Sequence, residues 1–149
     1  MNFRFIWIGK TKDSNWRALQ EDYFRRVSHF ASCSVVEIKD NMRADTTAEG
    51  KQILKNLSSR DLVVLLDVDG RKISSHDLAD TISSWQNRSI RDVVFIVGGA
   101  NGVASEVAER ADLRLSLSFL TFTHEMARVI LLEQLYRAFC IINRFPYQK

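Results

Sequence analysis

The segment DVVFIVGGANG, residues 92–102, combines a strand pattern with a glycine-rich turn. Its apolar run from Val93 to Val97 is typical of a strand buried on both faces of a sheet. Two adjacent glycines, Gly98 and Gly99, end the run, and Gly102 follows them. A glycine at the end of a strand lets another group approach the backbone closely. We therefore expect a ligand site here, with a plain strand-to-helix turn as the alternative.

The spacing of these glycines excludes two familiar phosphate-binding loops. A dinucleotide loop, G-x-G-x-x-G, counted from Gly98 would need glycines where the chain has Ala100 and Val103. A P-loop would need Lys and Ser or Thr after its last glycine, whereas Val103 and Ala104 follow Gly102. The ligand is therefore not expected to be held by a nucleotide-phosphate loop.

Strand and helix patterns alternate along the whole chain. Strands are expected at 2–9, 33–38, 61–67, 92–97 and 113–117. Helices are expected to start after Asp13, after capping boxes at Thr46 with Glu49 and at Ser74 with Asp77, near Ala104, and at 124–142. This order predicts an α/β fold, with a mostly parallel sheet covered by helices on both faces. We expect residues 1–149 to form a single domain.

Three segments follow strands of this sheet and are expected to meet. They are residues 65–70, 97–102 and 115–125. Ligands of open parallel sheets bind in a crevice beyond the carboxyl ends of the strands. Convergence of three loops is a stronger indication of a site than any one of them.

The composition indicates an ordered globular protein. Hydrophobic residues make up 46% and charged residues 26% of the 149 residues, with only 6 glycines and 1 proline. No apolar run reaches membrane-spanning length, and the first residues do not resemble a signal peptide. The two distant cysteines are expected to be free thiols in a reducing cytoplasm. Three histidines and these cysteines lack metal-ligand spacing, so no metal is expected.

Basic residues outnumber acidic ones by 21 to 18, which favours a polyanionic partner. They gather in two clusters, one near the start of the chain and one at its end. The clusters comprise Lys10, Lys12, Arg17, Arg25 and Arg26, and Arg137, Arg144 and Lys149. Two such clusters form one footprint for a nucleic acid if the ends of the chain, or two subunits, come together.

The segment VVLLDVDGRK, residues 63–72, suggests a competing function. A strand ending in Asp67-x-Asp69-Gly is similar to the nucleophile loop of haloacid-dehalogenase-type phosphatases, in which the first Asp attacks phosphorus. Arg71 departs from that pattern, two strands precede the motif, and no downstream acidic pair for magnesium follows a strand. Polar residues of a strand-end turn are the simpler interpretation.

The last helix and the tail offer two further indications. Apolar residues surround most of the helix, which predicts either a central position or a shared subunit interface. Glu133 and Arg137 stand four residues apart and can pair, either as a stabilising salt bridge or at an active site. Pro146 restricts the chain before Tyr147, which suits contact with a nucleobase, although so short a tail commonly frays.

Four segments together resemble a known family. LDVDGRKISSHDLA, FIVGGANGV, LSLSFLTFTHEMARVILLEQLYRAF and the terminal PYQK are similar to the ribosomal large subunit methyltransferase H family of the SPOUT superfamily, over almost the whole chain. The resemblance implies an S-adenosylmethionine-dependent enzyme that methylates N3 of a pseudouridine in 23S rRNA. It also implies a C-terminal trefoil knot, a rare exception to unknotted topology, and a cytoplasmic homodimer with its sites at the interface.

The matching motifs assign roles to individual residues. The resemblance places the methyl donor against Leu66, Gly98, Leu117, Ser118, Phe119, Leu120, Thr121 and Phe122. It places Arg137 and Tyr147 in family signatures, and these two residues with Glu133 are the catalytic candidates. Tyr147, Glu133 and a water remain alternatives for the base that accepts the N3 proton. From the basic clusters we assign RNA contact to Arg144, Lys149 and Lys10. No RNA-binding domain is appended, so an assembled ribosome is the expected substrate.

The tail also departs from the family pattern. Gln148 stands where the family usually has histidine, and glutamine cannot take up a proton. Thr123 and Ala100 replace residues common in the family, with milder consequences. Two alternatives therefore remain: a phosphotransferase using Asp67, and a ribosome-binding protein that keeps the fold without the activity.

Overall fold

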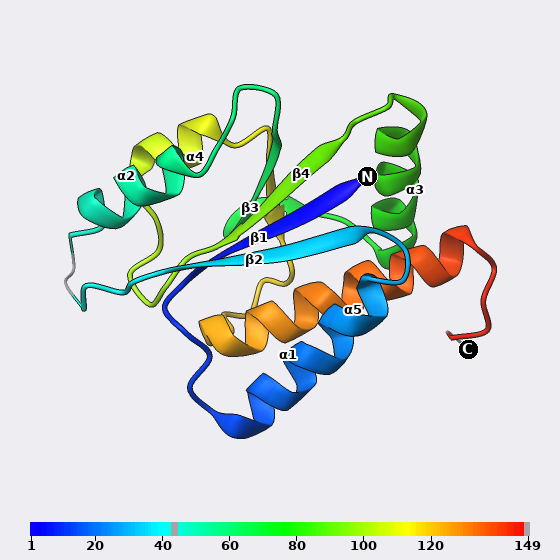
Figure 1. Cartoon of the computed structure of the whole chain (residues 1–149), viewed down its shortest axis with the longest axis horizontal. Coiled ribbons are helices and arrows are strands. Elements are labelled where there is room, and N and C mark those ends of the chain that lie inside the picture. The colour runs from blue at the N-terminus through cyan, green and yellow to red at the C-terminus, as the bar shows by residue number, and fades with distance from the viewer. Residues whose placement is uncertain (43–44, 148–149) are drawn as a thin grey trace.

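The computed structural model describes residues 1–42 and 45–147. Strands and helices alternate along these residues (Figure 1). The strands are β1 (Asn2–Ile8), β2 (Ser32–Ile38), β3 (Leu62–Lys72), β4 (Asp92–Val97) and β5 (Leu113–Ser116). The helices are α1 (Ser14–Val27), α2 (Thr47–Lys55), α3 (Ser75–Asn87), α4 (Ser105–Arg110) and α5 (His124–Ile142).

The strands form one parallel sheet in the order β2-β1-β4-β3-β5. Helices α1, α3 and α5 cover one face, and α2 and α4 cover the other (Figure 1). The prediction of a parallel sheet with helices on both faces is therefore confirmed. Because every strand points the same way, the segments that follow β1, β3, β4 and β5 emerge at the same end of the sheet.

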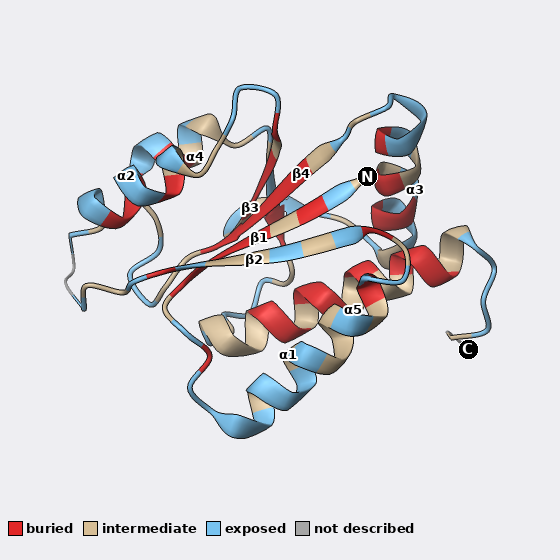
Figure 2. Ribbon diagram, viewed as in Figure 1, coloured by how far each residue is buried: buried red, intermediate tan, exposed pale blue. Residues whose placement is uncertain are grey.

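Because side chains alternate between the two faces of the sheet, β1 contributes residues to two separate cores. Phe3, Phe5 and Trp7 point into the larger core under α1, α3 and α5, whereas Ile6 and Ile8 point into the smaller core under α2 and α4. The buried strands lie between helices whose outer faces are exposed (Figure 2). Burial on both faces explains why the central strands read as unbroken apolar runs.

Two of the three predicted helix caps are confirmed, and the third is wrong. Asp13 accepts hydrogen bonds from two backbone amides of α1, and Ser74 and Asp77 form a reciprocal capping box at α3. Thr46 makes no side-chain cap at α2. Glu49 is buried and accepts a hydrogen bond from the Asn41 amide instead. A tertiary partner has therefore replaced the local one.

Strand β3 is interrupted after Leu66. Leu66 and Arg71 both pair with Leu115, so residues 67–70 bulge out of the ladder. A β-carbon on Gly70 would lie 2.7 Å from the carbonyl carbon and oxygen of Arg114. The bulge therefore packs backbone against backbone, which only glycine allows.

We expect Gly70→Ala to lower the free energy of unfolding by about 1–3 kcal/mol, since the added methyl group must displace the β5 backbone. Urea denaturation monitored by circular dichroism measures the change. Asp69→Ala is the matched control, because that exposed side chain lies in the same bulge without this contact. Unchanged stability of Gly70→Ala would mean that the bulge moves away from β5 freely.

Candidate functional site

The sheet register brings the three predicted ligand segments together. Leu65 pairs with Ile96 in β4, and Leu66 pairs with Leu115 in β5. Strand β3 lies between these neighbours, so Leu66 sits between the approach to Gly98 on one side and the approach to Leu117 on the other. The three segments that were expected to form a crevice therefore lie together at the carboxyl ends of neighbouring strands.

The glycine loop closes on itself. A β-carbon on Gly98 would lie 3.0 Å from the carbonyl oxygen of Gly102, and the Gly102 amide donates to the Gly99 carbonyl at 3.1 Å. Gly102 has a φ of +73°, a conformation that favours glycine. The close approach seen here is that of the loop's own backbone, so a larger residue at 98 would distort the loop. Contact of Gly98 with a ligand stays a prediction.

The segment 117–122 presents apolar side chains to solvent. Phe119 is 81% exposed and Leu120 is 72% exposed. Ser118 orders the turn, because its carbonyl accepts from the Ser116 hydroxyl and its hydroxyl accepts from the Leu120 amide, each at 3.0 Å. The Lys72 ammonium nitrogen lies 3.3 Å from the centroid of the Phe119 ring. Large apolar side chains held in solvent by an ordered turn are typical of a binding surface.

A pocket of about 290 Å³ lies behind this segment. It lies between the ends of β3 and β5, the start of α3 and the middle of α5. Its lining comprises Ile73, Ser74, Ser75, Leu78, Leu115, Ser116, Leu117, Ile130 and Gln134. Gln134 connects the pocket to the polar residues of α5, since its amide oxygen accepts from the Ser75 hydroxyl at 2.6 Å.

The three catalytic candidates meet around one carboxylate. Glu133 accepts from the Arg137 Nε at 3.0 Å and from the Tyr147 hydroxyl at 3.1 Å. Its other oxygen accepts from the Gln134 amide at 2.7 Å. The Arg137 guanidinium also lies 5.0 Å from the centroid of the Tyr147 ring. We call Glu133, Arg137 and Tyr147 the α5 cluster.

Tyr23 is a member of this neighbourhood that sequence reasoning missed. Its hydroxyl lies 3.2 Å from that of Tyr147, across 124 positions of the chain. In the sequence, Tyr23 shares one helix side with Trp16, Leu19 and Val27, a pattern that indicates packing alone. No local pattern marks a tyrosine whose hydroxyl meets a distant partner.

The protonation of the α5 cluster follows from these contacts. Burial, together with hydrogen bonds to Tyr23 and Glu133, raises the pKa of Tyr147 above its usual range. The hydrogen bond with Glu133 raises the pKa of Arg137 despite partial burial. Both side chains therefore keep their protons at neutral pH. In this arrangement Tyr147 is a neutral donor and an aromatic surface, and its phenolate is disfavoured as a base.

The tail is packed up to Tyr147. The Tyr147 ring meets Tyr136 edge-on at 4.7 Å between centroids, and its amide donates to the Phe145 carbonyl at 2.8 Å. These contacts favour the ordered tail over the frayed one. Gln148 and Lys149, to which we assigned a family departure and an RNA contact, lie outside the described residues.

Among the residues that the structure describes, Lys10 and Arg144 lie at opposite ends of α5. Lys10 precedes Lys12, whose amide donates to Glu125 at the start of α5, whereas Arg144 follows the end of that helix. A helix of 19 residues is about 28 Å long. Arg26 lies at the Arg144 end instead, 5.5 Å from the Tyr136 ring centroid. The two proposed RNA contacts at Lys10 and Arg144 therefore need two subunits to form one footprint.

Asp67 is held in an ion pair. One of its oxygens accepts from Arg114 at 2.9 Å and 2.5 Å, and the Asp69 amide donates to the other. Burial alone would raise the pKa of Asp67, but Arg114 and the Asp69 amide together lower it. A carboxylate paired in this way is a poor nucleophile, and the arrangement is that of a polar strand-end turn.

Comparison with known proteins agrees with this arrangement. A family model described as "Predicted SPOUT methyltransferase" matches residues 1–148. Relatives named "Ribosomal RNA large subunit methyltransferase H" are 37% identical over 153 residues in Desulfotalea psychrophila and 34% identical over 159 residues in Ureaplasma urealyticum serovar 10. Each match covers 100% of both chains.

Structural comparison supports the fold. The structure of a probable methylase family protein from Haemophilus influenzae Rd KW20 matches with a TM-score of 0.58 at 16% identity, covering 99% of this chain and 70% of the other. Within residues 1–42 and 45–147, no helix is long and apolar enough to cross a membrane. The same residues contain no group of three or more potential metal-binding side chains.

The raised pKa predicts that Tyr147 ionises above the ordinary range of tyrosine. Ultraviolet titration of the native protein, minus that of Tyr147→Phe, should isolate this late step. Because the folded-state pKa is raised above the unfolded value, the linked stability is present below the unfolded pKa and is lost as pH rises through the folded one. A difference spectrum with an ordinary tyrosine midpoint would show that Tyr147 is free in solution.

Proposed function

Because the chain belongs to the SPOUT methyltransferase family, we propose that it transfers a methyl group from S-adenosylmethionine to N3 of a pseudouridine in 23S rRNA. The observation that carries this proposal is similarity along the full length of relatives named for large-subunit rRNA methylation. The convergence of Leu66, Gly98 and the segment 117–122 at one edge of the sheet supports it. The ion pair at Asp67 weighs against a phosphotransferase.

The residues of this edge fit the methyl donor. S-adenosylmethionine carries a flat adenine and a sulfonium instead of phosphates, so apolar side chains and open backbone groups suit it. Phe119, Leu120 and Phe122 supply apolar surface, and Ser118 orders the turn that carries them. We propose that Leu66, Gly98 and Leu117–Phe122, Thr121 included, hold the donor.

Methyl transfer to N3 needs the loss of one proton. The N3 proton passes to a base, the freed lone pair attacks the methyl carbon, and the carbon–sulfur bond breaks. Bound S-adenosylmethionine supplies the electrophilic methyl group and a neutral thioether as leaving group. Alignment of the methyl carbon with N3 provides much of the rate acceleration.

The α5 cluster suits the substrate side of this reaction. As N3 loses its proton, negative charge spreads to the pyrimidine oxygens, and Arg137 is a fixed cation that offsets it. Glu133 orients Arg137 and accepts from Tyr147, so its lone pairs are already engaged. Tyr147 offers its ring to the target base. We therefore propose water as the proton acceptor and orienting roles for Glu133 and Tyr147.

A homodimer places both parts of the site in reach. Most of the apolar positions of α5 lie in the core of one chain, but Met126 and Ile130 stay half-buried and belong to neither core cluster. These residues recur with Gln134 and Arg137 at steps of three or four, so they share one helix face. We propose that this face meets a second copy, bringing the basic residues of two chains together.

Further properties belong to this proposal. We propose that residues 1–149 form a single methyltransferase domain with a C-terminal trefoil knot. The substrate is the assembled ribosome, contacted through Lys10, Arg144 and Lys149, and the protein works in the cytoplasm without a metal ion.

The proposed function predicts different losses at Arg137 and Tyr147. Ribosomes from a strain lacking the enzyme should gain one labelled methyl group, which mass spectrometry locates on N3 of a pseudouridine. Arg137→Gln should lower kcat by about 100-fold, because it removes the charge that offsets the developing anion. Tyr147→Phe should be mild and Tyr147→Ala severe, since the ring and not the hydroxyl is used.

Donor binding is the control for these variants. Calorimetry with S-adenosylmethionine should give the native affinity for Arg137→Gln and Tyr147→Ala. Donor binding without any methyl transfer by the native protein would favour the ribosome-binding alternative, in which the fold is kept and the activity is lost.

The proposed interface predicts that the native protein sediments as a dimer at micromolar concentration. Met126→Glu should shift it toward the monomer, because an unpaired buried charge costs about 3–5 kcal/mol. Leu19→Glu is the control, since Leu19 is an exposed apolar residue of α1. Sedimentation of the native protein as a monomer would show that this dimer does not form. A dimer that Met126→Glu does not dissociate would show that the interface lies elsewhere.

A further inference from the structure

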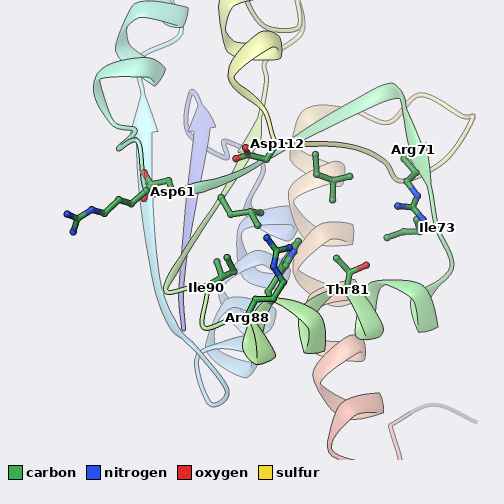
Figure 3. Close-up of a pocket in the computed structure, with 11 residues that line it drawn as sticks. Asp61, Arg71, Ile73, Thr81, Arg88, Ile90 and Asp112 are labelled. Atoms are coloured by element: carbon green, nitrogen blue, oxygen red, sulfur yellow. The ribbon is translucent and has the colours of Figure 1, made fainter.

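A second pocket, of about 490 Å³, lies between α3 and the edge of the sheet formed by β3 and β5 (Figure 3). Its lining comprises Arg60, Asp61, Leu62, Arg71, Ile73, Thr81, Trp85, Arg88, Ile90, Asp112 and Leu113. Its volume falls in the range of sites for small organic ligands. Ile73 also lines the pocket behind the segment 117–122, so the two pockets are neighbours. None of the donor or α5-cluster residues lines the larger one.

The floor of this pocket is apolar. Leu62, Ile90 and Leu113 come from the starts of strands and the turn before β4, and Trp85 comes from α3. Trp85 is 5% exposed and packs on Phe95 of the core, so the floor is rigid. A floor of this kind suits the face of a nucleobase, which gains from contact with apolar and aromatic side chains.

The rim carries three arginines. Arg60, Arg71 and Arg88 are exposed, and within residues 1–42 and 45–147 none of them forms an ion pair. Thr81 of α3 and Arg88, the residue that follows this helix, extend toward the strands above (Figure 3). The hydrogen bonds that Asp77 accepts from Ser74 have the largest effect in lowering the pKa of Asp77, and the charge of Arg71 has a smaller one.

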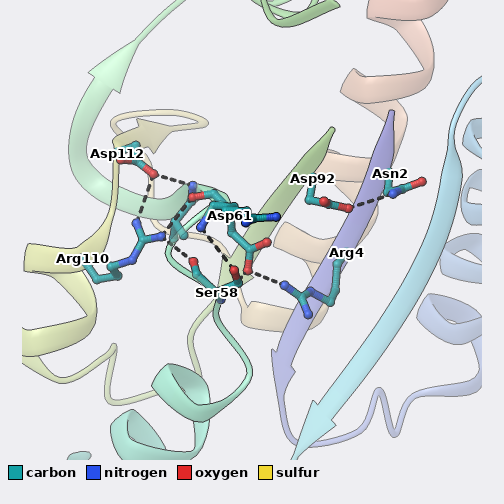
Figure 4. A network of polar contacts seen from close by, with 9 residues as sticks. Asn2, Arg4, Ser58, Asp61, Asp92, Arg110 and Asp112 are labelled. Atoms are coloured by element: carbon teal, nitrogen blue, oxygen red, sulfur yellow. Dashed lines mark hydrogen bonds and ion pairs between the residues drawn. The ribbon is translucent and has the colours of Figure 1, made fainter. Parts of the chain in front are cut away.

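The two carboxylates of the lining do not neutralise these arginines. Asp61 accepts from Arg4 at 2.5 Å and from the Ser58 amide at 2.7 Å. Asp112 accepts from Arg110 at 3.2 Å and from the Val63 amide at 2.8 Å (Figure 4). Both acids are therefore occupied by partners outside the pocket, and the pocket itself keeps a net positive rim.

We propose that this pocket takes a nucleotide of the substrate RNA that flanks the methylated one, with its base on the apolar floor and its phosphates on Arg60, Arg71 and Arg88. An apolar floor with a cationic rim matches a base joined to phosphates. Ile73 lines both this pocket and the one behind the proposed donor segment 117–122, so an RNA strand bound at that segment can continue into this pocket. The inference rests on the proposed function for its RNA substrate, and it assigns α3 and the β3–β5 edge a part in choosing that substrate.

Charge removal at the rim tests the phosphate contact. Fluorescence anisotropy with a short labelled single-stranded RNA is measured over a salt series. Arg88→Gln should weaken binding about fivefold and reduce the slope of log K against log salt by about 0.7, the value for one phosphate of a single strand. Arg91→Gln is the matched control, because Arg91 is an exposed arginine three residues away that does not line the pocket. Equal losses in both variants would reduce the effect to general electrostatics and overturn the proposal.

Filling the pocket tests the base contact. Thr81→Leu adds an apolar side chain from α3 and leaves every arginine in place, so RNA affinity should fall while the salt slope stays unchanged. Uridine monophosphate and adenosine monophosphate serve as competitors. Saturable binding of a free nucleotide with no response of RNA binding to either variant would identify a small-molecule site instead.

Methyl transfer separates this inference from the function on which it rests. Arg88→Gln should raise KM for ribosomes severalfold and leave kcat and donor affinity at native values. Native KM in Arg88→Gln with normal methyl transfer would overturn the inference alone. Absence of methyl transfer by the native protein would overturn the proposed function, while the anisotropy results would still decide whether the pocket binds RNA.

Discussion

Arg128 joins the last helix to the end of the first strand, and the arrangement of the site depends on this contact. Its guanidinium is fully buried and donates to the Ile8 carbonyl at 2.7 Å and to the Thr11 hydroxyl at 2.9 Å. Burial lowers its pKa to about 10, so it stays charged at neutral pH. A β-carbon on Gly99 would lie 3.2 Å from Ile8, which shows that the glycine loop rests on the same residue. The buried cation therefore fixes α5 to the end of β1, and the loop after β4 packs on the side chain of the same Ile8.

The elements governed by local patterns could be predicted from the sequence. The strand at 92–97 and the helix at 124–142 have the predicted bounds, because burial repeats with a period that the residues display. The capping box at Ser74 was also visible, since its partners are three residues apart. The one predicted at Thr46 is absent because the buried Glu49 accepts a hydrogen bond from the Asn41 amide, outside the helix.

Long-range contacts were beyond such patterns. The pairing of Glu133 with Arg137 was visible as a spacing, but the contacts of both with Tyr147 and of Tyr147 with Tyr23 were not. The extension of β3 past its bulge was missed because Gly70 reads as a turn. The sequence could not show whether Gly98 serves loop closure or ligand approach, because both require a glycine at that position.

Helices α1 and α5 meet at both of their ends. The Lys12 amide binds Glu125 where the helices begin, 113 positions away, and Tyr23 meets Tyr147 where they finish. Contacts of such large sequence separation slow folding, because loop closure must be completed before they form. During synthesis, the first helix must wait for almost the entire chain before its partner exists. The contact between Tyr23 and Tyr147 of the α5 cluster can therefore form only after nearly the whole chain has been synthesised.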